Sequence, residues 1–177
     1  AEIGLPVVMK IDSPSIVHKS DVGGVRLNIR SLAAVRSTYQ EIIDEVKRVQ
    51  PDAVINGIAI EPMIQKRNGR ELVVAVKRDP VFGPAITFGE GGNEVEANRD
   101  IAVALPPLNS FLVADMIRPT HNATRLGEFR NMPAVDMNAL ELVLLRISEV
   151  VCELPWVTEM EINPLIVGEM GNEPVVV

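Results

Sequence analysis

Short apolar runs with a two-residue period recur along the chain, and they restrict the fold more than any other feature. The strand-like runs cover residues 6–11, 24–29, 57–64, 71–77, 84–88, 101–105, 157–167 and 174–177. Helical patterns with good N-cap residues begin at Ser31, near Asn109 and at Asp136. Residues 78–84 form a turn that joins two runs into a hairpin. Clustered strands with helices inserted between them predict an α+β fold in layers.

Other segments are read from weaker patterns. Residues 121–133 have little periodicity, and we expect a loop there. Cys152 lies in a helical pattern without a nearby cysteine or paired histidine, which indicates core packing. Residues 1–4 resemble the frayed end of a helix, and the apolar residues 175–177 resemble a strand cut off without a turn. The chain therefore looks like a piece of a longer protein.

The composition excludes several classes of function. Lys and Arg number 17 against 24 Asp and Glu, and the net charge of −7 argues against binding a nucleic-acid duplex through a basic face. The single cysteine excludes an internal disulfide framework and fits a reducing compartment, so we expect a cytoplasmic protein. No apolar run approaches the roughly 18 residues of a transmembrane helix, so no membrane partner is expected.

Lys10 lies inside the first strand-like run. Alternation places Val7, Met9 and Ile11 on one face of this strand, and Val8 and Lys10 on the other. A lysine in this position needs solvent or an anion. The alternative is an edge-strand lysine whose side chain simply reaches water.

The segment that follows, residues 13–25, concentrates polar and glycine residues between two strands. It contains His18, Lys19 and the adjacent pair Gly23 and Gly24. Adjacent glycines allow backbone N–H groups to turn toward a phosphate, and a lysine adds positive charge. Gly-Gly is also common in simple turns, and a histidine here is a general base, a phosphoryl acceptor or a hydrogen-bonded loop residue.

The run at residues 157–167 carries a metal-like pattern. Alternation places Met160 and Ile162 on one face, and Glu159, Glu161 and Asn163 together on the other. Oxygen ligands of this kind suit Mg²⁺, which takes one or two carboxylates and fills its shell with water and phosphate oxygens. The alternative is a solvent-facing strand.

Two further segments are candidates for ligand contacts. Residues 89–96 form an acidic glycine-rich loop, which either wraps a ligand or only turns the chain. Residues 61–63, Glu-Pro-Met, end an apolar strand and could pair their backbone with a base edge, although a buried strand end is the simpler interpretation.

The motifs, taken in order, resemble one known family. They are Lys10 in a strand, His-Lys-Ser-Asp-Val-Gly-Gly-Val, Glu-Pro-Met, Gly-Arg-Glu-Leu, Arg-Asp-Pro-Val-Phe-Gly-Pro, Gly-Glu-Gly-Gly and Glu-Ile-Asn-Pro-Leu. Together they resemble the ATP-grasp domain of NDP-forming acyl-CoA synthetases, such as the ADP-forming acetyl-CoA synthetases and, more distantly, the β subunit of succinyl-CoA synthetase. Residues 88–92 and 104–109 look most like the version in Pat-type bacterial protein lysine acetyltransferases, where a synthetase-like region is fused to a GNAT domain.

The resemblance implies a role for each matching residue. His18 would pass a phosphoryl group between sites, and Glu161 and Asn163 would face Mg²⁺. The residues expected to bind the nucleotide, ATP or ADP, are Lys10, Lys19, Gly23, Gly24, Val25, Glu61, Pro62, Met63 and Glu71. The implied partners are CoA-binding domains of the same chain or of a partner chain.

The resemblance also implies two lobes, at residues 1–60 and 61–177, and an ATP-grasp fold that lacks the start of its lid lobe. Ala104 stands where many synthetases carry arginine, and the family's final metal-binding aspartate would come just after Val177. A fragment of this kind would be inactive alone. One alternative is a non-catalytic, ligand-sensing module that controls an attached acetyltransferase. An ATP-grasp carboxylate–amine ligase is disfavoured, because the segment around His18 is not typical of those enzymes.

Overall fold

The chain divides into two compact units, which are described separately. A computed structural model describes residues 3–64, 68–92 and 100–176. Ala1–Gln65 form the first unit and Lys66–Val177 the second. The expected division after residue 60 falls inside a strand of the first unit that ends at Pro62. Whether the two units are the two lobes of one nucleotide site stays a prediction.

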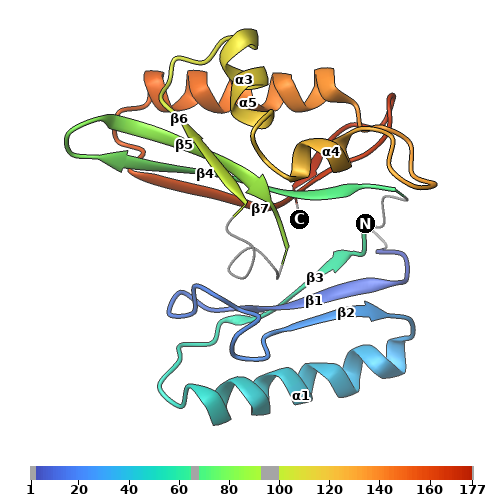
Figure 1. Cartoon of the computed structure of the whole chain (residues 1–177). Helices are drawn as coiled ribbons and strands as arrows, with labels where there is room; N and C mark the ends of the chain where they lie inside the picture. Colours follow the sequence, from blue (N-terminus) through green and yellow to red (C-terminus); the bar gives the residue numbers. More distant parts are fainter. Residues whose placement is uncertain (1–2, 65–67, 93–99, 177) are drawn as a thin grey trace. The chain divides into compact units, whose positions relative to one another are not determined.

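The first unit is a three-stranded antiparallel sheet covered by one helix (Figure 1). The central strand β1 (Val7–Asp12) pairs with β2 (Val25–Ile29) and with β3 (Gly57–Pro62). Helix α1 (Leu32–Val49) begins after Ser31, whose side chain accepts a hydrogen bond from the Ala34 amide. The core between sheet and helix contains Val7, Met9, Ile11, Ile16, Ile42 and Val46.

This arrangement corrects the edge-strand alternative for Lys10. Because β1 lies between two partners, Lys10 is in the middle of the sheet and not at its edge. The predicted alternation is confirmed, since Met9 and Ile11 pack against the helix. Lys10 therefore projects from the face that α1 does not cover.

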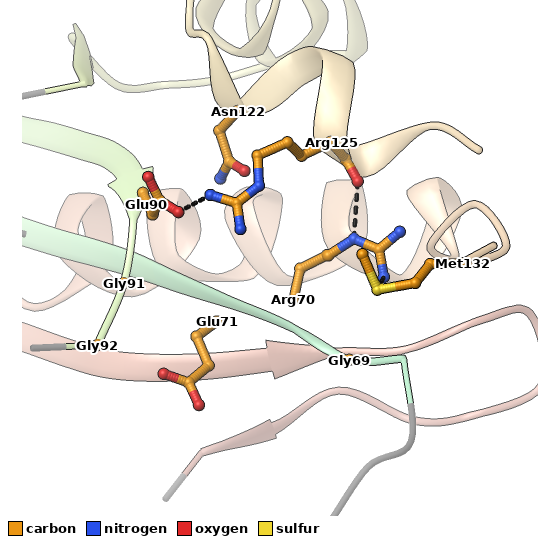
Figure 2. Close-up of a pocket in the computed structure, with 9 residues that line it drawn as sticks. All are labelled: Gly69, Arg70, Glu71, Glu90, Gly91, Gly92, Asn122, Arg125 and Met132. Carbon is orange, nitrogen blue, oxygen red and sulfur yellow. Dashed lines mark hydrogen bonds and ion pairs between the residues drawn. The ribbon is translucent and has the colours of Figure 1, made fainter. Parts of the chain in front are cut away.

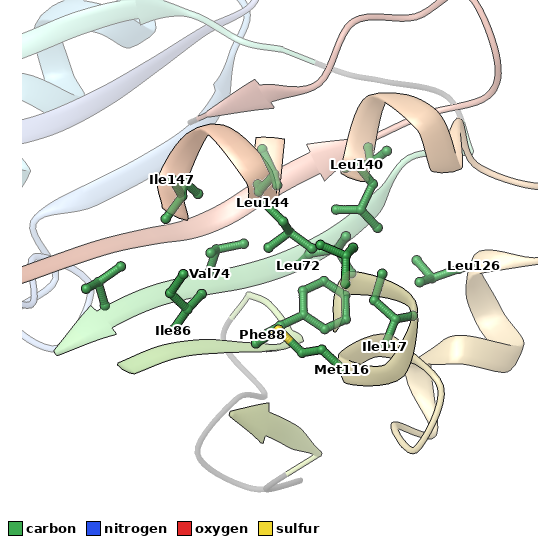
Figure 3. Packing of buried hydrophobic residues seen from close by; sticks show 14 of the residues in the cluster. Leu72, Val74, Ile86, Phe88, Met116, Ile117, Leu126, Leu140, Leu144 and Ile147 are labelled. Carbon is green, nitrogen blue, oxygen red and sulfur yellow. The ribbon is translucent and has the colours of Figure 1, made fainter. Parts of the chain in front are cut away.

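The second unit is a five-stranded antiparallel sheet with helices on one face (Figure 1). The strands, in their order across the sheet, are β6 (Ile101–Ala104), β5 (Gly83–Glu90), β4 (Arg70–Asp79), β7 (Glu159–Val167) and β8 (Val175–Val176). Helices α3 (Ser110–Ile117) and α5 (Met137–Glu153) pack on the same face. Figure 3 shows the core between these helices and the sheet, in which Phe88 is fully buried.

The structure differs from the sequence predictions in three places. Residues 121–133 are not only a loop, because Asn122–Leu126 form the short helix α4. Cys152 is exposed and not in the core, since the buried stripe of α5 passes through Val151 instead. Ile3 and Gly4 are not helical, while the rest of the predicted helix end, residues 1–2, lies outside the described residues.

In the described part of the chain, no helix is long and apolar enough to span a membrane.

The hairpin between β4 and β5 is held by one carboxylate and one guanidinium. Asp79 Oδ1 accepts hydrogen bonds from the amides of Val81 at 2.7 Å and Phe82 at 2.9 Å. These two bonds favour the charged form and hold the pKa of Asp79 below its usual value. Arg78 donates to the carbonyls of Val151 and Val157, which attaches the hairpin to the end of α5.

The core of the second unit yields a stability prediction. We expect Phe88→Ala to lower the free energy of unfolding by about 3–5 kcal/mol, because the change leaves a cavity in a closely packed core. The matched control is Phe111→Ala, since Phe111 is 70% exposed, and its effect should stay within about 0.5 kcal/mol. Urea unfolding followed by circular dichroism measures both changes. Equal losses in the two variants would contradict the core assignment.

The Asp79 turn yields a prediction on pH. Because the folded pKa is depressed, the carboxylate stabilises the hairpin above the unfolded pKa of about 3.9, and this contribution disappears as pH falls through the folded value. The stability difference between the wild type and Asp79→Ala should therefore be constant above about pH 4 and shrink below it. Asp79→Asn keeps an acceptor that does not titrate and is the control. A stability difference that persists unchanged into strong acid would refute this role.

Candidate functional residues in each unit

In the first unit, Lys10 and Glu61 form an ion pair on the open face of the sheet. Lys10 lies opposite Ala59 and Glu61 lies opposite Val8, so the two side chains are diagonal neighbours on β1 and β3. Lys10 Nζ is 2.8 Å from Glu61 Oε2, and their side chains are 23% and 48% exposed. The lysine charge is thus held in place and remains reachable from solvent.

The loop that follows β1 presents His18 to solvent. Its two glycines serve the turn itself: the amide of Gly23 donates to Ser20 at 3.0 Å and that of Gly24 donates to Lys19 at 2.8 Å. Gly23 has a φ of +66°, and a Cβ on Gly24 would lie 2.5 Å from a methyl carbon of Ile11. The amides expected to face a phosphate are therefore engaged inside the loop, and a phosphate role requires the loop to open. Val25 begins β2 directly after this pair.

The Glu-Pro-Met segment continues the pairing of β3 with β1. Pro62 lies opposite Val7, and the Met63 amide donates to the carbonyl of Pro6 at 3.0 Å. This N–H is therefore already used within the sheet. A role for residues 61–63 beside a nucleotide base stays a prediction.

In the second unit, Glu161 and Asn163 lie together on the exposed face of β7, as predicted. Asn163 Nδ2 donates to Glu161 Oε1 at 3.3 Å, and Asn163 Oδ1 accepts from the amide of Gly92 at 2.8 Å. The third residue of the predicted face, Glu159, instead pairs with Lys77 at 3.0 Å. The oxygen cluster therefore consists of one carboxylate and one amide.

Glu71 also approaches this cluster, through Gly92. A Cβ on Gly92 would lie 2.5 Å from Glu71 Oε2, so the carboxylate lies directly against that glycine. Among the described residues, no group of three His, Cys, Asp or Glu side chains could hold a metal ion. Two oxygen ligands on one strand nevertheless fit Mg²⁺, which completes its shell with water and phosphate oxygens. Residues 93–96 of the predicted acidic loop lie outside the described residues.

A pocket of about 440 Å³ lies next to this cluster, at the ends of β4 and β5 (Figure 2). Helix α4 supplies Asn122 and Arg125 to its wall, and Arg125 forms an ion pair with Glu90. Asn122 is 3% exposed, and its Nδ2 donor has no hydrogen-bond partner among the described residues. The remaining lining residues are Gly69, Arg70, Glu71, Gly91, Gly92 and Met132.

Arg70 anchors α4 and its following segment to the start of β4. Its side chain is 5% exposed and donates to the carbonyls of Arg125 at 2.7 Å and Pro133 at 3.0 Å, and to that of Asn68. A further contact reaches the sulfur of Met132 at 3.6 Å. Burial, and to a lesser degree the charge of Arg125, lower the pKa of Arg70 from its usual value.

The pocket wall formed by Arg70 and Arg125 is not predicted from the sequence. Asn122 and Arg125 lie in residues 121–133, where a loop is expected from the sequence, and α4 has no local side-chain cap that would mark its start. Asp100 provides the cap from a distance, accepting from the amides of His121 and Asn122 at 2.8 Å each. Gly-Arg-Glu-Leu at residues 69–72 is a local signal for this region, and of its residues only Glu71 is predicted to be in the site.

Comparison with known proteins identifies the family. Residues 1–177 match the family described as an ATP-grasp domain. The chain is 39% identical over 168 residues to the ADP-forming acetate–CoA ligase I subunit beta of Pyrococcus furiosus, covering 95% of this chain and 72% of that subunit. It is also 39% identical to the ADP-forming acetate–CoA ligase I of Archaeoglobus fulgidus, covering 96% of this chain but only 24% of that protein. The chain belongs to the ATP-grasp domain family, in the branch found in ADP-forming acyl-CoA synthetases.

A solved structure supports the α+β ATP-grasp fold. Acetyl-coenzyme A synthetase 1 of Ca. Korarchaeum cryptofilum, in complex with coenzyme A and Ca-AMPCP, superposes with a TM-score of 0.89 at 42% identity. The match covers 99% of this chain and 75% of that one. A second structure of the same synthetase holds Mg-AMPPCP, with its phosphohistidine segment pointing towards the nucleotide binding site (TM-score 0.78, 37% identity, 98% of this chain and 74% of that one).

The loop that contains Gly91 and Gly92 yields a prediction. We expect Gly91→Ala to destabilise the fold by about 1–3 kcal/mol through overpacking, because a Cβ there would lie 2.4 Å from the backbone of Leu72. Gly127→Ala is the control, since its φ is −71° and its nearest neighbour would be 3.7 Å away. Thermal unfolding of the two variants checks the difference. A Gly91→Ala protein as stable as the control would show that the loop does not need this close approach.

Proposed function

We propose that this chain is the nucleotide-binding domain of an ADP-forming acyl-CoA synthetase, which interconverts acyl-CoA, ADP and phosphate with acid, CoA and ATP. The observation that carries the proposal is the match of 95% of the chain, at 39% identity, to the β subunit of such a ligase. Six of the predicted site residues lie on accessible surfaces of their own units, while Gly24 is buried. The six are Lys10, His18 and Glu61 in the first unit, and Glu71, Glu161 and Asn163 in the second.

Each group has a role that fits its surroundings. Lys10 exchanges its Glu61 partner for a phosphate oxygen and neutralises charge that develops during transfer. Lys19, Gly23, Gly24 and Val25 border the phosphates once the loop opens. Residues 61–63 border the base and ribose, and Glu71, whose carboxylate lies against Gly92, also contacts the nucleotide.

Glu161 and Asn163 supply the oxygen ligands for Mg²⁺. The bound ion would neutralise and orient the phosphate oxygens. The hydrogen bond from Asn163 to Glu161 holds the two side chains on the same side of β7 before any ligand arrives. The described donor set is thus of the hard-oxygen type that Mg²⁺ prefers.

His18 accepts the phosphoryl group. A nitrogen of its ring attacks the γ-phosphorus of ATP, a P–N bond forms, the bond from phosphorus to the bridging oxygen breaks, and ADP leaves. The exposed position of His18 on a loop suits a residue that must meet a nucleotide and then a second site. The second site, for acid and CoA, would lie in CoA-binding domains outside this chain, since the single-chain relative is about four times longer.

A link to a GNAT-type acetyltransferase is a separate and finer proposal. It rests on the resemblance of residues 88–92 and 104–109 to the version of the domain in Pat-type acetyltransferases. In that version the domain senses a ligand and does not turn it over. The labelling experiment below distinguishes the two versions, because a sensor binds nucleotide without forming a phosphohistidine.

The proposal predicts a labelled histidine. Full-length protein incubated with γ-labelled ATP and Mg²⁺ should carry acid-labile, base-stable phosphate, and His18→Ala should lose it while binding ATP within about twofold of the wild type. Lys10→Gln should weaken ATP binding by about 10- to 100-fold, the cost of one charge-assisted hydrogen bond. The control is Lys47→Gln, a change of an exposed lysine at the end of α1. Label retained in His18→Ala would end the relay role, and absent ATP binding in the wild type would end the nucleotide function.

A further inference from the structure

The pocket beside α4 connects three segments in a closed ring of contacts. Arg70, on β4, holds the backbone of Arg125 through the hydrogen bond from its Nε to the Arg125 carbonyl. The side chain of Arg125 forms an ion pair with Glu90, the last residue of β5. One residue later, the amide of Gly91 donates to the Glu71 carbonyl at 2.8 Å, which returns to β4. Figure 2 shows these groups around the pocket.

The residue after this ring of contacts, Gly92, reaches Asn163, the amide of the oxygen cluster on β7. The N–H of Gly92 donates to Asn163 Oδ1 at 2.8 Å. Asn163 Nδ2 in turn donates to Glu161, so both ends of the amide are held and its orientation is set. An amide oxygen has two lone pairs, and the Gly92 N–H uses one of them. The second remains for a ligand.

The Glu90–Arg125 pair is suited to holding this loop. The side chain of Glu90 is 18% exposed and that of Arg125 is 46% exposed, so the pair is only partly accessible to water. Burial of Arg70 fixes the backbone from which Arg125 extends, and Asp100 fixes the start of the same helix. Arg125 therefore adds a side-chain contact to a loop that β4 already holds through the pairing of Leu72 with Glu90 and the hydrogen bond from Gly91 to Glu71.

We propose that Arg125 is a positioning residue for the metal site: through Glu90 and the Gly91–Gly92 backbone, it holds the side chain of Asn163 so that one lone pair of its oxygen stays available to a Mg²⁺ ion. The inference rests on the proposed function, in which Glu161 and Asn163 hold that ion. Outer groups that orient metal ligands typically change metal affinity by 10- to 100-fold when they are removed. Arg125 acts one step further out, so a change of about tenfold is expected.

The first test measures metal dependence in the full-length protein. Calorimetric titration with ATP at a series of free Mg²⁺ concentrations should show that Arg125→Gln needs about tenfold more Mg²⁺ for half-maximal binding, while affinity at saturating Mg²⁺ changes less than twofold. Arg125→Lys should recover most of the loss. Glu90→Gln should act like Arg125→Gln, and the double variant should be no worse than either single one, since both remove the same contact.

The control is Arg118→Gln, which breaks a neighbouring ion pair with Asp115 on the exposed surface of the same unit. A second readout needs no metal: amide hydrogen exchange at residues 89–92 should speed up in Arg125→Gln and stay unchanged in Arg118→Gln. A merely structural role would lower overall stability without changing the Mg²⁺ requirement, and that result would overturn the inference.

Asn163→Ala separates the inference from the proposed function. If Asn163→Ala raises the Mg²⁺ requirement and Arg125→Gln does not, the metal site stands and the positioning role is wrong. If neither variant changes the Mg²⁺ requirement, the metal role of Asn163 itself is wrong and the inference falls with it. Raised requirements in both variants, together with faster exchange at residues 89–92 in Arg125→Gln, support the inference.

Discussion

Strand alternation is the constraint on which both units depend. In each sheet one set of side chains is apolar and packs under a helix, so polar residues of the same strand must lie on the opposite face. In β1 this separates Met9 from Lys10, and in β7 it separates Ile162 from Glu161. The groups proposed for the nucleotide and for the metal are therefore placed by the same packing that forms the cores.

Arg70 illustrates how a buried charge organises irregular structure. An isolated charge is costly to bury, but a guanidinium can be satisfied by several carbonyl groups at once. Arg70 uses the carbonyls of Asn68, Arg125 and Pro133, which belong to three segments without mutual strand pairing. Removing the side chain would leave those carbonyls without a donor, so the helix α4 depends on a residue of the sheet.

The regular elements were predictable from sequence because their signals are local. Ser31, Asn109 and Asp136 each accept a hydrogen bond from the amide three residues ahead, as N-cap residues do. Helix α4 was not predictable in this way, because its cap is Asp100, which precedes the helix by more than twenty residues. Cys152 was misplaced for a different reason: in α5 the buried stripe passes through its neighbour Val151.

The candidate site was only partly predictable, since composition and motifs do not show which donors are already used. The pattern at residues 23–24 predicts amides that face a phosphate, and the pattern at residues 89–96 predicts a loop that wraps a ligand or only turns the chain. The amides of the two glycine pairs instead donate to Ser20, Lys19, Glu71 and Asn163. Both loops use glycine for close backbone approach.

Because the amides of Gly23 and Gly24 are engaged in the loop, lysine side chains are the main donors proposed for phosphate in the first unit, within a chain of net charge −7. Lys10 already has an anionic partner, because its Nζ lies 2.8 Å from Glu61 Oε2. A triphosphate carries more charge than one carboxylate, and Glu61 is half exposed and can return to water at little cost. In the proposed function, nucleotide binding by Lys10 would therefore be an exchange of anions, in which the carboxylate keeps the ammonium group in position until the phosphate replaces it.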